Sequence, residues 1–466
     1  MRKTLRTRPE QILNGKVLPT LLKLSVPAII AFTFHTTFNF VDRLFVSRLG
    51  AVELGALGMA FTVQSILITI GSGTGIGASS LIARFIGAGK KDKADNAAEH
   101  TLLIILGLSL LVTILGPFLT RPLFVLLGAS EQMLPYILSY INIILYGSFF
   151  QFFAMIGNGI LRGEGNTVTP MRVMILGTLV NIVLDPLLIF GIGPFPALGV
   201  QGAAIATVIG RAVSCILLAV SLFGKKNIVM LNMRAFRYEG AIVRGIFAVG
   251  GPTIVGQLSN SLGLSLLFIL LRPYGDMAKS AFTLGFTYQQ VAILPIIGIA
   301  QGTLTMTGQN FGARKVERVK AVVQKSLLFC VAFMCGFALV MIAGRGVFVR
   351  VFSDVEEVIR IGRSMLLIFA LGFPFLAARF ILTSFFQGLG KGFTAFVINF
   401  SYIILFAMPL ALLLSRAIGI EGIWSALVLG NLLSSVLGAV WAVATGRRLE
   451  TGITEPMSDA AEKKPV

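Results

Sequence analysis

Two polar residues lie in one of the most apolar stretches of this chain, NIVLDPLLIF at residues 181–190. Asn181 and Asp185 are four residues apart, so a helix places them on the same face. Pro186 follows, and because proline has no N–H, the carbonyl of Ile182 becomes a free acceptor beside the carboxylate. An ionised Asp at the centre of a membrane helix costs about 2.5–3.5 kcal/mol on insertion scales, so it is functional by default. Such a group of oxygens can bind a cation or hold a proton.

The composition places this chain in a membrane. Of its 466 residues, 56% are hydrophobic and only 13% are charged, whereas soluble domains carry roughly a quarter charged residues. Apolar runs of about 20 residues, the length that crosses the hydrocarbon core as a helix, recur from end to end. Without strand-type alternation these runs must be helices, because their backbone groups have to be satisfied internally. We therefore predict an all-α polytopic membrane protein.

The formal net charge of +19 does not indicate nucleic-acid binding, because the basic residues occupy short connectors between apolar runs rather than one soluble face. With both termini in the cytoplasm, the inner connectors collect roughly 27 Lys and Arg and the outer connectors about 10. Only an even number of spans gives this distribution. We predict twelve transmembrane helices, at about residues 19–47, 53–84, 97–120, 133–162, 167–191, 199–223, 241–271, 278–308, 316–344, 357–388, 393–416 and 421–446.

The chain repeats itself. SVPAII at 25–30 aligns with GGPTIV at 250–255, which places Pro27 opposite Pro252 at a spacing of 225; near the ends of the two copies, GVQGAAIATVIG aligns with GIEGIWSALVLG at a spacing of 220. Two copies of six helices have the same orientation, so we predict two pseudo-symmetric six-helix lobes with a cavity between them, as in transporters. The predicted parts are a basic cytoplasmic N-terminus (1–18), an N-lobe (19–223), a cytoplasmic linker (224–240), a C-lobe (241–446) and a cytoplasmic tail (447–466).

A second intramembrane acid, Asp42, lies about 18 residues into the first predicted helix, as Asp185 does in the fifth. Both helices run outward, so the two carboxylates reach a similar depth in the outer half of the membrane. Thr207, about eight residues into the descending sixth helix, reaches a comparable depth. With Asn181, these residues form a predicted cation- or proton-coupling site. Their oxygens suit Na⁺ and suit equally a proton shared between carboxylates, so the sequence leaves the coupling ion open.

Further polar residues are candidates for a substrate cavity or a proton relay. His35 and Asn39 precede Asp42 by seven and three residues, so the three share one helical stripe, and Tyr140 reaches a similar estimated depth. The alternatives are structural: a charge paired at the helix end for Asp42, a helix cap for Asp185, a bond to its own helix for Thr207, a packing residue for His35 and an interfacial aromatic for Tyr140.

The duplication provides an internal control for the two acids. At the spacing of 225, Asp42 corresponds to Leu267, and the Asp-Pro pair at 185–186 corresponds best to Met-Pro at 408–409. If the acids only assisted folding of the repeat, both halves would carry them. Their confinement to the first half favours ion coupling there, with the second half contributing walls and gates.

Five stretches in order carry a resemblance to a known family: VDRLFVSRLGAVELGALG, GIGASSLIARFIGAGKKDKA, RGEGNTVTP, NIVLDPLLIF and GVQGAAIATVIG. Through them the chain resembles the multidrug and toxic compound extrusion (MATE) transporters over about residues 20–446. The resemblance implies a twelve-helix, two-lobe exporter that exchanges Na⁺ or H⁺ for organic compounds, often lipophilic cations. The acids in the first lobe are similar to those of the DinF-like branch.

The resemblance also carries over to individual positions. It implies that the coupling site, which could hold Na⁺, consists of Asp42, Asn181, Asp185 and Thr207; that Asn158 matches a polar cavity position on the fourth helix; and that Pro27 is a hinge at which the first helix bends. The chain departs from the pattern at Asn260, where some members carry an acid on the seventh helix, which puts a second-lobe cation site in doubt.

We therefore predict a cation-coupled antiporter of organic compounds in the plasma (inner) membrane, acting by alternating access. The chain lacks HExxH and GxSxG motifs, and we predict no enzyme activity and no cofactor. The alternative transporter function is a flippase for lipid-linked precursors, which would need a strongly basic cavity; only Arg211 and Arg379 lie deep in the predicted spans. The expected partners are small organic substrates and membrane lipid, and we expect a monomer.

Overall fold

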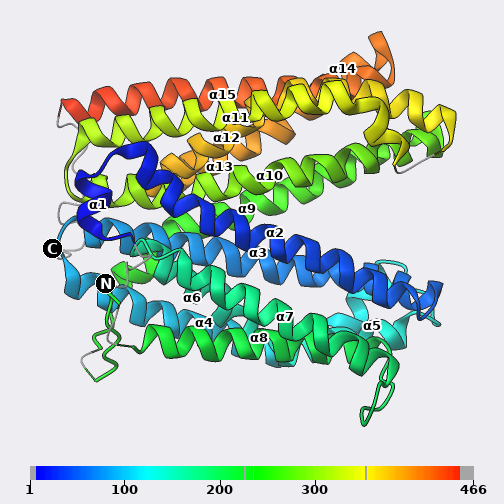
Figure 1. Ribbon diagram of the computed structural model, residues 1–466, viewed down its shortest axis with the longest axis horizontal. Coiled ribbons are helices and arrows are strands. Elements are labelled where there is room, and N and C mark those ends of the chain that lie inside the picture. The colour runs from blue at the N-terminus through cyan, green and yellow to red at the C-terminus, as the bar shows by residue number, and fades with distance from the viewer. Residues whose placement is uncertain (1–6, 225–226, 235, 352–353, 452–466) are drawn as a thin grey trace. The chain divides into compact units, whose positions relative to one another are not determined.

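The computed structural model describes residues 7–224, 227–234, 236–351 and 354–451, and for residues 38–44 it describes the backbone alone. The described residues are mostly helical and contain no strand (Figure 1). The elements are α1 (Pro9–Asn14), α2 (Val17–Ser47), α3 (Ala51–Gly87), α4 (Lys91–Leu126), α5 (Leu134–Tyr146), α6 (Ser148–Gly163), α7 (Val168–Phe190), α8 (Val200–Leu222), α9 (Gly240–Leu270), the 3₁₀ helix η1 (Arg272–Tyr274), α10 (Gly275–Gly312), α11 (Val316–Arg350), α12 (Glu356–Gly388), α13 (Gly392–Phe400), the π-helix η2 (Ser401–Ala407), α14 (Met408–Ile418) and α15 (Ile420–Glu450).

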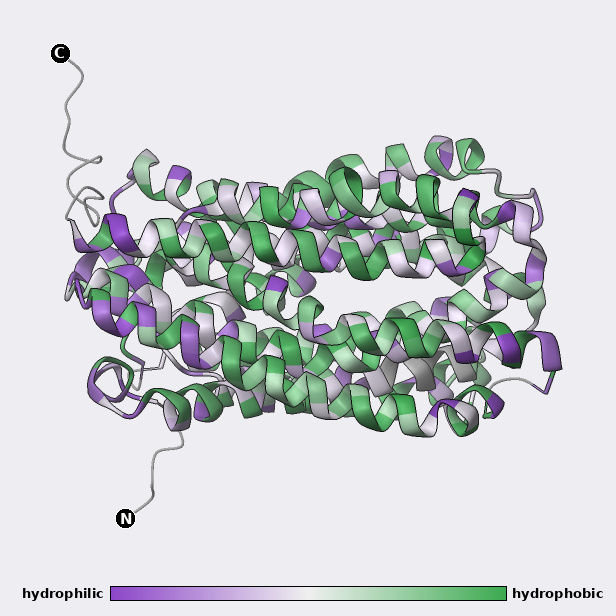
Figure 2. Cartoon of the chain, turned by 90° about the horizontal axis from the view of Figure 1, so that it is seen from above, coloured by the Kyte–Doolittle hydropathy of each residue, from purple (hydrophilic) through white to green (hydrophobic). Residues whose placement is uncertain are grey.

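Most of these helices are long enough to cross a membrane. Within the described residues, eleven helical segments meet the requirements of length and apolar composition, and there are twelve spans if the bent pair α5–α6 is one. Figure 2 shows hydrophobic residues along the helices and hydrophilic residues mainly at their ends and in the connections. The prediction of an all-α polytopic membrane protein is confirmed.

Two of the predicted spans are not uniform helices. The fourth, 133–162, consists of α5 and α6, which meet at 53° on either side of Gly147. A Cβ at this glycine would lie 2.6 Å from a methyl carbon of Val208, so the bend lies where α8 approaches most closely. The eleventh, 393–416, contains the π-helix η2 between α13 and α14, and π-helical turns occur frequently at functional sites.

The chain forms two compact units. Unit 1 consists mainly of Ile30–Ile86 and Lys90–Gly250, and unit 2 mainly of Thr7–Ile29 and Gly251–Val466. Two of the points at which the chain passes from one unit to the other lie inside a helix near a proline: two residues after Pro27 in α2 and directly before Pro252 in α9. Near each of these two points one helical hydrogen bond is missing. Residues 19–29 pack with unit 2, although the sequence groups them with the N-lobe.

Glycines bring the helices of unit 1 into close contact. α7 and α8 run side by side (Figure 1), and a Cβ at Gly177 would lie 2.7 Å from the carbonyl oxygen of Gly210. Nearer the other end of the same pair, a Cβ at Gly202 would collide with the carbonyl oxygen of Leu188. Small residues let membrane helices approach at backbone distance, which is where dispersion contacts are strongest. This close approach fixes how α8 faces the polar residues of α7.

Acidic side chains hold the connection between α8 and α9 against unit 1. Glu164 Oε2 accepts hydrogen bonds from the N–H groups of residues 228 and 229, at 3.0 and 3.2 Å. Asp95 and Glu99 each accept one from the same connection, both at 2.8 Å. Nε2 of the buried His100 accepts the N–H of Glu239 at 2.8 Å. The connection is thus bound through its backbone N–H groups. No sequence motif predicted these hydrogen bonds.

The core of unit 2 contains a cluster of aromatic side chains. The fully buried Trp424 of α15 stacks on Phe282 of α10, with ring centroids 5.7 Å apart and planes at 7°. Phe369 of α12 meets the same indole edge-on, at 6.2 Å. Aromatic pairs of this geometry contribute roughly 0.5–1.5 kcal/mol beyond their buried area. These contacts hold α10, α12 and α15 together.

Replacing Gly202 with Val tests the close contact between α7 and α8. The new side chain has to displace the Leu188 carbonyl, and such overpacking costs about 1–3 kcal/mol. We expect a Tm several degrees below that of the unchanged protein, measured by thermal unfolding in detergent. Gly107→Val in α4 is the matched control, because nothing lies within 4 Å of a Cβ at Gly107. Equal losses in the two variants would contradict the contact.

Candidate functional site

Asn181 and Asp185 form a hydrogen-bonded pair inside α7. Asn181 Nδ2 donates to Asp185 Oδ1 at 2.9 Å, and the two side chains are 4% and 0% exposed. The helix continues through Pro186 to Phe190 and ends at Gly191, whose φ is +73°. Asp185 is therefore an interior residue of the helix, and the alternative of a helix cap is wrong. The geometry expected from the spacing of four is present.

α8 faces this pair at close range. A Cβ at Gly210 would lie 3.0 Å from Asn181 Cβ, so the helix backbone itself covers the amide. Thr207, which is half-buried, precedes Gly210 by three residues and therefore lies on the same face of α8. The membership of Thr207 in the coupling site therefore stays a prediction.

The other residues that the sequence predicts at the depth of Asp185 lie at a similar distance from the same ends of their helices. Asp185 is five residues before the end of α7, Asp42 five before the end of α2, Thr207 seven after the start of α8 and the buried Tyr140 six after the start of α5. At about 1.5 Å per residue, all four lie about 8–10 Å from the same ends of their helices. The side chains of Asn39 and Asp42 lie outside the described residues, so their helix position alone is placed.

A second polar group lies deeper in unit 1. Arg211 Nη1 of α8 donates to Gln151 Oε1 of α6 at 2.8 Å. His35 of α2 has an exposed side chain within electrostatic range of the Arg211 charge. Along the helices, His35 and Arg211 are about 17 Å from the ends nearest Asp185, roughly two turns below the carboxylate. Gln151 was not singled out from the sequence, where the only signal was a lone arginine in a span.

Asn158 does not belong to either group. It lies five residues before the end of α6, whereas Asp185 lies 17 residues after the start of α7. Because the two helices are consecutive and joined by a short turn, the residues are about 18 Å apart along the helix axes. Asn158 is buried, and its Oδ1 has no hydrogen-bond partner among the described residues.

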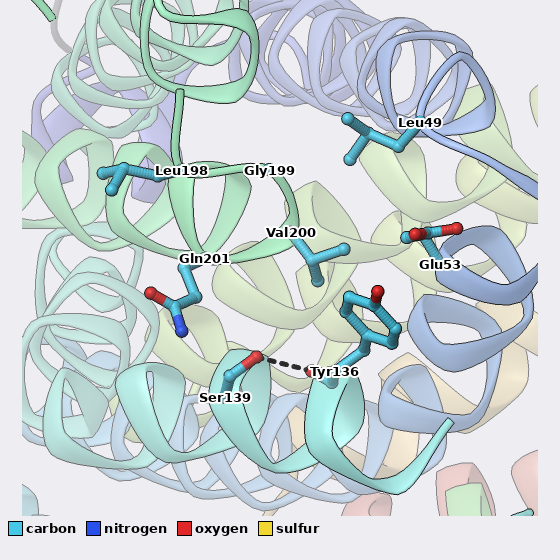
Figure 3. A pocket seen from close by; sticks show the side chains of 8 residues that line it. All are labelled: Leu49, Glu53, Tyr136, Ser139, Leu198, Gly199, Val200 and Gln201. Carbon is cyan, nitrogen blue, oxygen red and sulfur yellow. Dashed lines mark hydrogen bonds between the residues drawn. The ribbon is translucent and has the colours of Figure 1, made fainter. Parts of the chain in front are cut away.

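A pocket opens at the end of unit 1 nearest to Asp185. Its volume is about 170 Å³, and its polar side chains are Glu53, Tyr136, Ser139 and Gln201 (Figure 3). Ser139 Oγ donates to the carbonyl oxygen of Tyr136 at 2.9 Å. Tyr136 is one helical turn before Tyr140 on α5, so the pocket ends close to the depth of the predicted coupling site. None of its lining residues was a sequence candidate.

The donor set suits a hard monovalent ion or a proton rather than a transition metal. Within the part of the chain that the structure describes, no three His, Cys, Asp or Glu side chains gather as a metal site. On α7 a carboxylate and an amide are hydrogen-bonded to each other, and Pro186 leaves the carbonyl oxygen of Ile182 without its helical partner. Oxygen donors of this type coordinate hard cations.

The sequence matches the model of a known protein family in two places. The sequence model described as MatE matches residues 27–187 and again residues 252–413. The two matches begin 225 residues apart, at Pro27 and Pro252, which is the spacing of the internal repeat.

Individual relatives cover almost the whole chain. An FAD transporter of Shewanella oneidensis is 30% identical over 430 residues, which are 91% of this chain and 94% of the relative. The probable multidrug resistance protein NorM of Thermotoga maritima is 24% identical, with 90% of each chain covered. The solved outward-facing structure of a multidrug resistance MATE family transporter of the MOP superfamily superimposes with a TM-score of 0.90 at 29% identity, covering 96% of this chain and 99% of that one.

A double-mutant cycle tests whether Asn181 and Asp185 interact as the geometry requires. A hydrogen bond to a charged group contributes about 1.5–3 kcal/mol, so we expect Asn181→Ala and Asp185→Ala to be coupled by an energy of that order in thermal unfolding. The control cycle pairs Asp185→Ala with Asn158→Ala. At about 18 Å separation, these effects should add within about 0.5 kcal/mol. A coupling energy near zero in the first cycle would contradict the pair.

Proposed function

Because this chain belongs to the MatE family of transporters, we propose that it exports small organic compounds, often lipophilic cations, in exchange for Na⁺ or H⁺. Members of the family are transporters and not enzymes, and the relatives include multidrug exporters. The observation that carries the ion coupling is the buried Asp185, held by Asn181 inside a membrane helix. Carboxylates buried in membrane helices mark ion and proton pathways.

Coupling follows from the charge of the site. With the site empty, the carboxylates of Asp42 and Asp185 carry negative charge in an apolar unit; a bound Na⁺ or proton neutralises them. The neutral and charged forms therefore favour different packings of the helices that surround them. An ion and a drug that favour opposite states of one alternating-access equilibrium exchange with each other, and no direct contact between the two is required.

Pro27 is the proposed hinge of this change. It interrupts the hydrogen bonding of α2 within two residues of the point where the helix leaves unit 2 and enters unit 1. Asp42 lies on the unit 1 side of that point. Neutralisation of the acid is therefore communicated to a helix that belongs to both units.

We place the protein in the plasma (inner) membrane as a monomer with both termini in the cytoplasm, because Lys and Arg concentrate in the connectors on that side. His35, Asn39 and Tyr140 remain proposed relay or cavity residues near the site. Asn158 is a proposed cavity residue of the opposite end of unit 1.

A second candidate substrate class is organic anions. An FAD transporter is among the relatives that cover nine-tenths of this chain, and FAD carries a diphosphate. A buried cation, Arg379, lies in unit 2. This candidate concerns the cargo and leaves the proposed coupling site unchanged.

Drug efflux from proteoliposomes with Na⁺ and H⁺ gradients imposed separately tests the coupling. We expect one gradient to drive efflux in the unchanged protein. Asp42→Asn and Asp185→Asn should each lower the gradient-driven rate at least about tenfold, because each variant lacks one of the two negative charges that the ion neutralises.

Asp276→Asn is the matched control, since Asp276 is an exposed acid paired with Lys279 at the start of α10, and it should transport at the unchanged rate. Wild-type rates in both test variants would refute coupling at this site and would favour the flippase alternative.

A further inference from the structure

Arg379 of α12 is a deeply buried cation whose partners are all neutral. Its side chain is 3% exposed. Nε donates to Asn431 Oδ1 of α15 at 2.9 Å, and Nη1 donates to Asn399 Oδ1 of α13. The guanidinium carbon lies 4.3 Å from the centroid of the Tyr402 ring and 4.9 Å from that of Phe380.

No acid on the helices α9 to α15 is placed to balance this charge. Every Asp and Glu of α9 to α15 lies within the first two residues of its helix or is its last residue. Arg379 lies nine residues before the end of α12, and Tyr402 ten residues after the start of α13, so the cluster is about 14–15 Å from the helix ends. Among the described residues, no carboxylate lies within 4 Å of this guanidinium.

The repeat makes the contrast with unit 1 direct. At the spacing of 220, Asn431 corresponds to Arg211. Unit 1 therefore has the arginine on the sixth helix of the repeat and the amide, Gln151, on the fourth, whereas unit 2 has the arginine on the fourth and the amide on the sixth. Both units hold an arginine–amide pair across the same two helices of the repeat. Among the described residues, only the pair of unit 1 has a buried acid, Asp185, about two helical turns away.

A small gap adjoins the Arg379 cluster. It measures about 20 Å³ and is lined by two partners of the arginine, Tyr402 and Asn431, and by Gln289 of α10. Phe369 and Phe373 form part of its wall. This volume fits about one water or one oxyanion oxygen, while the aromatic wall offers faces on which a ring can stack. Tyr402 belongs to the π-helix η2.

We propose that Arg379 is an anion-recognition point of unit 2, which takes a phosphate or carboxylate oxygen of an aromatic organic anion. Amides and ring faces compensate a desolvated guanidinium only in part, and an oxyanion supplies the missing charge with hydrogen bonds in the geometry that guanidinium prefers. The proposal deepens the second candidate function and rests on it for the choice of ligand. A lipid phosphate has the same chemistry and is the other source of such an anion.

Riboflavin and FMN are a matched pair of probes, because they differ only by a phosphate. Binding of each to the full-length protein in a neutral maltoside detergent is measured by equilibrium dialysis at fixed ionic strength. We expect FMN to bind at least about tenfold more tightly than riboflavin, the ratio that one charge-assisted hydrogen bond gives. Equal affinities in the unchanged protein overturn the proposal.

Substitution of the arginine identifies the source of the preference. Arg379→Gln should bind FMN and riboflavin within about twofold of each other, while its riboflavin affinity stays near that of the unchanged protein. Arg350→Gln removes the same charge from an exposed helix end and should keep the full preference. A preference that survives in Arg379→Gln overturns the proposal.

If Arg379→Gln does not fold, Arg379→Lys is used to test whether the arginine causes the preference for FMN over riboflavin. Lysine keeps the charge but loses the planar fork that bonds two amides and an oxyanion together, so the preference should fall about threefold or more, and an unchanged preference overturns the proposal. Added phosphatidylglycerol distinguishes the sources: if it weakens FMN binding in the unchanged protein only, lipid phosphate occupies the same point, and if it has no effect the point selects the soluble anion. Neither result requires ion-driven transport, so failure of the proposed coupling would leave this test intact.

Discussion

A charged group inside a membrane helix has to be compensated, and the arrangement of this protein depends on that constraint. Water is absent from the hydrocarbon region, so each buried charge needs a hydrogen-bond partner from another turn or another helix. Asp185 has Asn181 one turn away, Arg211 has Gln151 on α6, and Arg379 has amides on α13 and α15. These amides are neutral. We propose that an ion completes the site of Asp185 and that a substrate anion completes the site of Arg379.

The partners can reach these charges because the helices approach at backbone distance. Gly210 lies against Asn181, Gly177 against the backbone of α8, and Gly147 gives room to Val208 at the bend between α5 and α6. A larger residue at any of these places would push α8 away from the polar residues that it covers. The glycines thus determine the geometry of the predicted coupling site although they carry no chemistry themselves. Helix–helix packing in lipid relies on such contacts, since burial of apolar surface offers no advantage there.

Duplication supplied one framework and divergence gave each copy its own electrostatics. The prolines at 27 and 252 are kept in both halves, and both lie where the chain crosses between the compact units. The acids are kept in the first half only, where Asp185 corresponds to Met408 in the second. The first unit therefore holds the buried carboxylate that we propose couples the cation, and the second holds the buried arginine that we propose recognises an anion. One framework can in this way serve ion and cargo in separate units.

Hydrophobic runs, charge asymmetry and the internal repeat by themselves determined the helical membrane class, the two-fold repeat and the position of the acids. These are properties of local composition and spacing, because apolar stretches of about 20 residues have few structural alternatives in lipid. The pairing of Asn181 with Asp185 followed from a spacing of four on one helix. The matching depth of Asp42, Asp185, Thr207 and Tyr140 followed from counting along the helices.

Only the tertiary structure decided which residues from different helices meet. Gln151 beside Arg211, Asn399 and Asn431 beside Arg379, and the carboxylates that hold the connection after α8 all depend on helix rotation and close packing, which no local pattern encodes. Composition determines that a helix spans the membrane, and packing against its neighbours determines what that helix faces.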